Sequence, residues 1–399
     1  MKYLIFFLFL LIPININALE INSKHAILYN MNEDMVLYEK DADTRTYIAS
    51  LTKIMTTIVA IENIDDINEY VTIPYEGLEG LIEANASVAG FRLGQKVTYK
   101  DLLYGILLPS GADATKTVAY YIAGSEEKFV DLMNEKAEEL GLTNTHFANT
   151  SGLDTDNHYS TVREMSIILK YALQNETFKE IYTTNKYTTS DNSLTFKSVY
   201  SNYLNRYDLE NKYVYGSKTG YTTLAGYCLS TIANYDGVEY MLITTNADGT
   251  SNYPLHIMDA QMIYDYYTSN YHYLDIINES DTLITLDTKN SKEDKLEIKA
   301  NETFSKYLNN EITKDDFTFD YSGLKEVDYF TDKGQIGTLN IKLDNEIIET
   351  IQIIYSGGLT FSFISLYLDN LIISIPITFL ILFIIIKGIS VLLIPHRIK

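Results

Sequence analysis

The segment Ser50-Leu51-Thr52-Lys53 combines a hydroxyl and an amine at a spacing that suits nucleophilic catalysis. It opens an apolar, helix-forming run that extends to Glu62. Residues three apart lie on one face of a helix, so both side chains can reach the same pocket. A serine hydroxyl needs a base to take its proton, and a buried lysine near other cations can be neutral enough to do so. Taken alone, the pair also fits an N-cap serine followed by a surface lysine.

Two further segments support a catalytic interpretation of that pair. Ser110-Gly111-Ala112 follows an apolar stretch and opens another helical pattern, and Lys218-Thr219-Gly220 precedes a strand-like run at residues 225–232. S-x-x-K, a serine-led triad and K-T-G, in this order, are the signature of penicillin-binding proteins and class A β-lactamases. Three such motifs in order are far more specific than any one of them, so they favour catalysis over chance.

The two ends of the 399-residue chain predict export and membrane attachment. Residues 1–18 have an early lysine, an apolar core and a small residue at a cleavage edge, which predicts a secretory signal. Residues 371–394 are apolar apart from Lys387 and long enough to cross a hydrocarbon core of about 30 Å, which predicts a transmembrane helix. The basic tail at 395–399 favours a cytoplasmic C-terminus, with the rest of the protein outside the cell membrane. A buried helix of the soluble part is the alternative for residues 371–394.

Composition narrows the class of ligand that we expect. The formal net charge is −22, which argues against a nucleic-acid partner because such a partner requires a basic face. The single cysteine, Cys228, excludes an intramolecular disulfide, and its apolar surroundings predict a small buried residue. We find no cluster of histidines and cysteines and no glycine-rich phosphate motif, so the sequence predicts no metal, nucleotide or other cofactor.

The hydrophobic pattern predicts an α/β (α+β) catalytic domain over residues 19–272, followed by a small all-β domain over residues 275–357. Residues 25–30 and 35–39 alternate around a turn-rich segment, as a hairpin does, and helical patterns then dominate to residue 173. Strand patterns return at residues 215–221, 226–234 and 238–246, and a helix is expected at 256–267. Strands at both ends with helices between them favour one mainly antiparallel sheet flanked by helices.

With these residues in view, the chain resembles the D-alanyl-D-alanine carboxypeptidases, which are low-molecular-mass penicillin-binding proteins of the serine peptidase type. The resemblance covers roughly residues 20–270. It includes the nucleophile segment at 47–56, the stretches Asn149-Thr150-Ser151-Gly152-Leu153-Asp154 and His158-Tyr159-Ser160-Thr161, and the K-T-G segment with the strand after it. It implies a β-lactamase/transpeptidase-like catalytic domain, and the β-rich domain and C-terminal anchor also fit the family layout.

The resemblance assigns the chemistry of acylation to three residues. Ser50 would attack the terminal D-Ala-D-Ala bond of a peptidoglycan stem peptide and form an acyl-enzyme, with Lys53 as general base. Ser110 would help pass the proton to the departing D-alanine. The same nucleophile would be acylated by β-lactam antibiotics, which would act as covalent inhibitors.

Binding of the substrate is assigned to the third motif. Lys218 and Thr219 would offer a cation and a hydroxyl to the terminal carboxylate of the substrate. Gly220 would let the substrate strand lie close to the sheet edge. The backbone N–H groups of Ser50 and Tyr221 would form the oxyanion hole, in which the loss of one donor typically costs on the order of 10²–10³ in rate.

Two positions depart from the family pattern. Ala112 stands where the family usually has an asparagine that bonds the substrate backbone, and one lost hydrogen bond is worth roughly 0.5–1.5 kcal/mol. His256 stands where an arginine often supports the substrate carboxylate. It would serve only in part and only when protonated, and a plain helix-start histidine is the alternative.

Two other functions remain open at this stage. A β-lactamase of class A usually supplies a deacylating glutamate in an E-x-x-L-N stretch, which this sequence lacks, and the second domain and anchor fit that class poorly. A weakly active or inactive relative that binds wall peptides is supported only by Ala112. The retention of Ser50, Lys53 and Lys218 argues against it.

Overall fold

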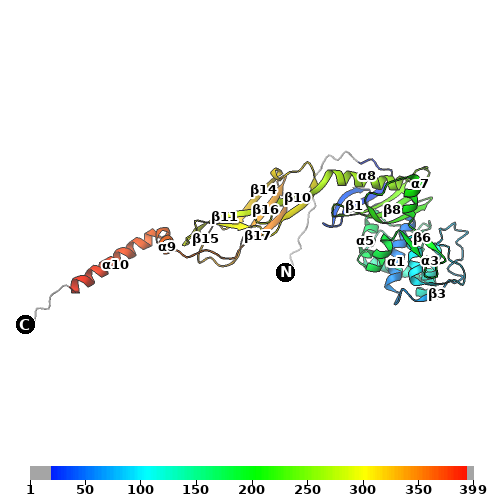
Figure 1. Cartoon of the computed structure of the whole chain (residues 1–399), viewed down its shortest axis with the longest axis horizontal. Helices are drawn as coiled ribbons and strands as arrows, with labels where there is room; N and C mark the ends of the chain where they lie inside the picture. Colours follow the sequence, from blue (N-terminus) through cyan, green and yellow to red (C-terminus); the bar gives the residue numbers. More distant parts are fainter. Residues whose placement is uncertain (1–18, 393–399) are drawn as a thin grey trace, which may run out of the picture. The chain divides into compact units, whose positions relative to one another are not determined.

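The computed structural model describes residues 19–392, and the chain divides between Tyr267 and Thr268 into two compact units. Figure 1 shows the elements of both. The predicted signal at 1–18, the basic tail at 395–399 and the end of the predicted anchor lie outside the described residues.

The first unit is organised by one antiparallel sheet of five strands in the order β2-β1-β9-β8-β7. Its strands come from both ends of the unit, since β1 pairs with β9, and Ile27 faces Ile243. The antiparallel sheet predicted from the hydrophobic pattern is therefore confirmed. Cys228 in β8 is fully buried, as predicted. The strands are β1 (His25–Asn30), β2 (Met35–Lys40), β7 (Val214–Thr222), β8 (Gly226–Tyr235) and β9 (Val238–Ala247).

Helices cover both faces of this sheet. Helix α8 (Leu255–Asn270) lies on one face, and α1 (Thr52–Glu62) and α5 (Val162–Ala172) lie on the other (Figure 1). Helix α1 is buried from its first residue to Ala60 on every side, so it is the central helix of the unit. Around it are α2 (Tyr99–Leu107), α3 (Ala112–Ala123), α4 (Glu126–Glu139), α6 (Glu176–Thr183) and α7 (Val199–Tyr207).

Four short strands in the first unit were not predicted. They form two hairpins, β3 with β4 and β5 with β6, and each strand has only three residues. A run of three residues is too short for alternation to be visible in the sequence. The strands are β3 (Tyr70–Thr72), β4 (Lys96–Thr98), β5 (Lys186–Thr188) and β6 (Thr195–Lys197).

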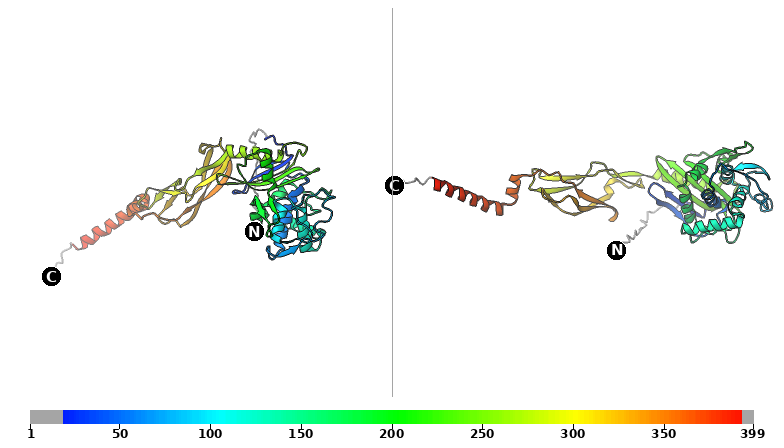
Figure 2. Two further views of the ribbon diagram at one scale, coloured as in Figure 1. Left: turned by 45° about the vertical axis from the view of Figure 1, so that its right-hand side comes forward. Right: turned by 90° about the horizontal axis from the view of Figure 1, so that it is seen from below.

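The second unit consists mainly of strands, β10 to β17, seen in two further views in Figure 2. Asp344 and Asn345 both have positive φ and join β16 to β17 in a hairpin. Such a pair suits the tight turns that match strand twist. The strands are β10 (Tyr271–Ile277), β11 (Thr282–Lys289), β12 (Lys295–Lys299), β13 (Phe304–Asn309), β14 (Phe317–Gly323), β15 (Glu326–Asp328), β16 (Gly334–Leu343) and β17 (Glu346–Tyr355).

The chain continues into two helices, α9 (Phe363–Asp369) and α10 (Leu371–Leu392). Within residues 19–392, no single helix is long and apolar enough to cross a membrane. Helix α9 and residues Leu371–Lys387 together meet that requirement by length and composition, with a bend of 110° between them.

Candidate active site

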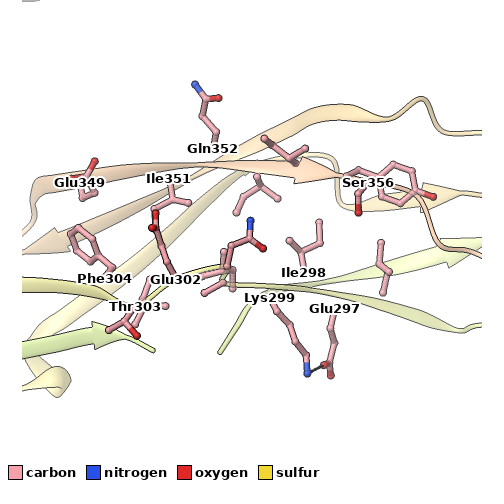
Figure 3. Close-up of a pocket in the computed structure, with 18 of the residues that line it drawn as sticks. Glu297, Ile298, Lys299, Glu302, Thr303, Phe304, Glu349, Ile351, Gln352 and Ser356 are labelled. Carbon is pink, nitrogen blue, oxygen red and sulfur yellow. Dashed lines mark ion pairs between the residues drawn. The ribbon is translucent and has the colours of Figure 1, made fainter. Parts of the chain in front are cut away.

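A cavity of about 910 Å³ opens in the second unit between β12, the segment after it and β17. Figure 3 shows Ile298 and Ile351 on opposite strands of this cavity. The one lysine that lines it, Lys299, pairs with Glu297 at 3.9 Å. The cavity therefore lacks a hydroxyl activated by an amine, and the candidate active site lies in the first unit.

Ser50 and Lys53 share one pocket at the start of the central helix. Ser50 lies in a short 3₁₀ turn (Ala49–Leu51) that leads directly into α1. Lys53 Nζ lies 3.2 Å from Ser50 Oγ and donates to it. Ser50 is partly exposed, whereas Lys53 is 1% exposed, so the serine is open to solvent and the lysine is buried. The structure thus brings together the pair that the sequence spacing predicted.

Burial changes the acidity of the Lys53 amine. Desolvation lowers its pKa to about 7, although the carboxylates of Asp113 and Glu126 act in the opposite direction. The amine also donates to the backbone carbonyl of Ser151 at 2.6 Å, which fixes its position. A lysine with this pKa is neutral in a large fraction of molecules at neutral pH, and a neutral amine can accept a proton.

Lys218 joins the third motif to the second. Its Nζ donates to Ser110 Oγ at 2.9 Å and to the carbonyl of Thr219 at 2.8 Å. Lys218 is 2% exposed, and burial together with the nearby Lys53 amine holds its pKa well below the usual range. Ser110 has a φ of +66° and lies in the turn before α3.

The rest of the K-T-G segment lies on β7, an edge strand of the sheet. A Cβ atom on Gly220 would lie 2.9 Å from the backbone nitrogen of Ser50, so only glycine allows this close approach. Thr219 is nearly buried, and Tyr221 is half exposed. An edge strand offers unpaired backbone groups, which an extended peptide can bond.

Two polar side chains that the sequence analysis did not identify position the site. Asn149 Oδ1 accepts from the N–H groups of Gly152 at 2.7 Å and Leu153 at 3.1 Å, which shapes the loop carrying the Ser151 carbonyl. Asp113 is 1% exposed, and its carboxylate accepts from the N–H groups of residues 89–91 at 2.7–3.0 Å. The stretch at residues 149–154, which resembles the family, was a sequence signal for Asn149. The sequence contained no signal for the role of Asp113.

His158, which lies in the H-Y-S-T stretch, is hydrogen-bonded to the nucleophile segment. Its Nε2 lies 2.6 Å from Thr52 Oγ1, and Thr52 Oγ1 donates to the carbonyl of Ala49 at 2.8 Å. Burial is the main reason that the pKa of His158 falls to about 4, so the ring is neutral at physiological pH. The H-Y-S-T stretch was the only sequence signal for it.

The structure also describes the two positions that depart from the family pattern. Ala112 is the first residue of α3, is 1% exposed and offers no polar side-chain atom. His256 is fully buried in α8 and stacks on Tyr227 with ring centroids 4.6 Å apart. Neither of its ring nitrogens has a hydrogen-bond partner among the described residues, and burial lowers its pKa to about 3. A protonated His256 that holds a carboxylate is therefore contradicted, and the alternative of a helix-start histidine stands.

Comparison with known proteins gives the class and then the family. The solved structure of the Streptomyces K15 DD-transpeptidase is similar with a TM-score of 0.55 and 33% identity, covering 62% of this chain and 97% of that chain. Penicillin-binding protein 5 from Haemophilus influenzae shares the fold at 23% identity, with a TM-score of 0.61, over 86% of this chain and 98% of that one. The protein thus has the penicillin-binding, transpeptidase-like fold that the sequence predicted.

Sequence relatives agree with this class. A sequence profile described as D-alanyl-D-alanine carboxypeptidase matches residues 13–249, which is more than half of the chain. The D-alanyl-D-alanine carboxypeptidase DacF of Bacillus subtilis is 30% identical over 328 residues, which are 82% of this chain and 83% of that protein. The chain belongs to the D-alanyl-D-alanine carboxypeptidase family of serine peptidases.

Proposed function

We propose that this enzyme removes the terminal D-alanine from peptidoglycan stem pentapeptides through an acyl-enzyme on Ser50. The observation that carries the proposal is the 3.2 Å contact between Ser50 Oγ and the buried amine of Lys53. Membership of the carboxypeptidase family gives the substrate class. The role in cell-wall biogenesis follows from that substrate.

Acylation proceeds in a balanced sequence of proton transfers. Neutral Lys53 takes the proton of Ser50 Oγ, and the oxygen forms a bond to the carbonyl carbon of the penultimate D-alanine. The C–N bond to the terminal D-alanine then breaks. Ser110, which is hydrogen-bonded to Lys218 at 2.9 Å, helps pass the proton that Lys53 took from Ser50 to the departing amine, so Lys53 is neutral again when D-alanine leaves. Water hydrolyses the ester and regenerates the Ser50 hydroxyl.

Substrate recognition is assigned to β7. Lys218, whose protonated form the bound carboxylate would favour as an opposite charge, and the hydroxyl of Thr219 bind the terminal carboxylate, which explains a requirement for a free C-terminal acid. The substrate backbone lies along the open edge at Gly220, where no side chain intervenes. The N–H groups of Ser50 and Tyr221 hold the oxyanion that forms on the attacked carbonyl.

Covalent labelling with a fluorescent penicillin tests the nucleophile. We expect stable labelling of the wild-type enzyme and none of Ser50→Ala, with Ser166→Ala, a buried serine of α5 outside the site, labelled normally. Labelling that persists unchanged in Ser50→Ala would overturn the assignment. Rapid turnover of penicillin in place of a stable adduct would point to a β-lactamase.

A weakly active relative that binds wall peptides is the second candidate, favoured only by Ala112. Release of D-alanine from a diacetyl-Lys-D-Ala-D-Ala peptide separates the two functions. Release that depends on Ser50 supports the carboxypeptidase. A labelled enzyme that releases no D-alanine at high enzyme concentration would favour the binding protein.

We also propose that residues 19–272 carry the catalysis on the extracellular side, followed by the β-rich domain at 275–357. Residues 371–394 then attach the chain to the cell membrane as a single pass. The apolar pair of α9 and Leu371–Lys387 supports this by length and composition. The full chain should stay in the membrane fraction in alkaline carbonate and leave it in detergent, whereas a chain that ends at residue 362 should be soluble. Carbonate extraction of the full chain would contradict the anchor.

A further inference from the structure

The peptide group between Ala49 and Ser50 is held at both of its polar ends. The Ala49 oxygen accepts from Thr52 Oγ1 at 2.8 Å and from the Thr52 backbone N–H. A Cβ on Gly152 would lie 1.9 Å from the same oxygen, so the Gly152 backbone packs directly against it. At the other end, Gly220 packs against the Ser50 nitrogen.

This peptide group needs to be held because its backbone is strained. Ala49 has a φ of +46°, in the left-handed region that residues with a Cβ rarely adopt. Such a conformation costs on the order of 1–3 kcal/mol and persists only when its surroundings determine it. The hydroxyl of Thr52 is one of the groups that determine it.

The hydrogen bonds of His158 determine which atom donates in each of the contacts that link His158, Thr52 and the Ala49 carbonyl. The Ala148 N–H donates to His158 Nδ1 at 3.1 Å, so Nδ1 must be an acceptor and the proton of the neutral ring must be on Nε2. Nε2–H therefore donates to Thr52 Oγ1, which leaves the hydroxyl proton of Thr52 to go to the Ala49 oxygen. This series of hydrogen bonds therefore runs from His158 through Thr52 to the Ala49 carbonyl.

These hydrogen bonds also determine the direction of the Ser50 N–H. The described chain has no cis peptide bond, so the Ala49 carbonyl and the Ser50 N–H belong to one planar trans unit and point in opposite directions. We infer that His158 and Thr52 are positioning residues that aim the Ser50 N–H into the oxyanion hole by holding the carbonyl at the other end of the same peptide group. The inference rests on the proposed function, in which Ser50 is the nucleophile and its N–H binds the oxyanion.

A positioning role differs from general acid–base catalysis by His158. The ring is 2% exposed, packs edge-on against Phe147 at 5.8 Å and reaches Ser50 only through Thr52. The charged or titratable groups whose fields act on it are Lys53 and His146. Because the ring donates as a neutral group, its contribution should be the same at every pH at which the enzyme works.

The Thr52 hydroxyl is tested by a matched pair of variants. Thr52→Val removes the hydroxyl at nearly constant shape, and Thr52→Ser retains it. We expect Thr52→Val to lower the rate constant of penicillin acylation and kcat for D-alanine release by about tenfold or more, bounded by the roughly 10²–10³ lost with a whole oxyanion donor. Thr52→Ser should stay within about threefold of wild type, and KM should not change in either variant.

The end-point of labelling separates positioning from loss of structure. A positioning role leaves the labelled fraction near one per chain and slows only its approach to that value. A structural role lowers the labelled fraction in proportion to activity. A Thr52→Ser variant as slow as Thr52→Val, or a Thr52→Val variant as fast as wild type, would overturn the inference.

His158→Phe keeps an aromatic ring and removes the donor, so it completes a double-mutant cycle with Thr52→Val. If the two residues act in one chain, the double variant should be about as slow as the slower single variant. Losses that multiply would overturn the inference, and so would a shift of the acid limb of the pH profile in His158→Phe. If the wild-type enzyme itself takes no penicillin label at Ser50, the proposed function fails. If the wild-type enzyme is labelled and Thr52→Val is acylated equally fast, only the inference is contradicted.

Discussion

Lys218 Nζ donates to Ser110 Oγ across 2.9 Å, so one hydrogen bond joins two motifs that are 108 residues apart in the sequence. Both groups are buried, and the amine makes its other hydrogen bond to the carbonyl of Thr219. The Lys218 amine thus holds the Ser110 hydroxyl in place. A hydroxyl held in this way can pass the proton that Lys53 took to a leaving group without water.

Ser110→Ala removes this relay and should slow D-alanine release. General acid–base catalysis contributes typically 10²–10⁴-fold, so we expect a fall in kcat within that range. KM should change little, because the Ser110 hydroxyl acts on the departing amine. Steady-state kinetics with the tripeptide measures both quantities. Ser166→Ala is the control, since its hydroxyl donates to the carbonyl of Arg163 within α5, and it should retain wild-type kcat.

The pH dependence of acylation should follow the protonation of Lys53. Its pKa is lowered to about 7 chiefly by burial, and only the neutral amine can accept the proton of Ser50. Acylation should therefore be slow below pH 7, rise through pH 7 and level off above it. The rate constant of penicillin labelling from pH 5 to pH 9 measures this limb.

Lys53→Arg tests whether the limb belongs to this amine. A guanidinium stays protonated throughout the range, so the variant should acylate poorly at every pH. Lys116→Arg, at a lysine that bonds the Glu79 carbonyl outside the site, should keep the wild-type profile. An acid limb near pH 7 that survives in Lys53→Arg would assign the proton transfer to another group.

How much of the site is predictable from sequence depends on the kind of contact. Ser50 and Lys53 are three residues apart in the continuous run of the 3₁₀ turn and α1, so helical periodicity allows them to meet, and the other two motifs favour that contact over a surface lysine. The contact of Lys218 with Ser110 is not local, and only the order of motifs predicts it. The contribution of Ser151 is a backbone carbonyl, and no residue type identifies a carbonyl in a sequence. His158 and Thr52 are joined across 106 residues, without a motif that includes both.

The elements of the fold also differ in how far the sequence predicts them. Strands β8 and β9 were predicted from the strand patterns at residues 226–234 and 238–246, and Asp236-Gly237, a pair typical of tight turns, lies between them. The pairing of β1 with β9 follows only from closure of the sheet, since their separation in the sequence gives no local signal. The 3₁₀ turn at Ala49 was missed, because it depends on Gly152 and Gly220, whose backbones pack against it from distant segments.

Gly152 and Gly124 provide a matched test of this packing. Their φ angles are +86° and +82°, so an alanine costs similar backbone strain at either position, about 1 kcal/mol. A Cβ on Gly124 would meet nothing within 4 Å, whereas one on Gly152 would lie 1.9 Å from the Ala49 oxygen. Urea denaturation should show a clearly larger loss of stability for Gly152→Ala, with slower penicillin acylation only in that variant. Equal losses in both variants would mean that the contact is relieved without cost.

His256 gives the last prediction, because its ring is buried without partners for either nitrogen among the described residues. An unsatisfied buried polar group costs about 1–3 kcal/mol, and an apolar group of the same shape avoids that cost. His256→Phe should therefore raise the free energy of unfolding by about 1 kcal/mol or more while it keeps the stack on Tyr227. The same change at His146, whose Nδ1 bonds the Asn157 carbonyl at 2.5 Å, should instead lower stability. KM for the tripeptide should be unchanged in His256→Phe, since the ring is fully buried in α8, and a tenfold rise in KM would restore His256 as a ligand of the substrate carboxylate.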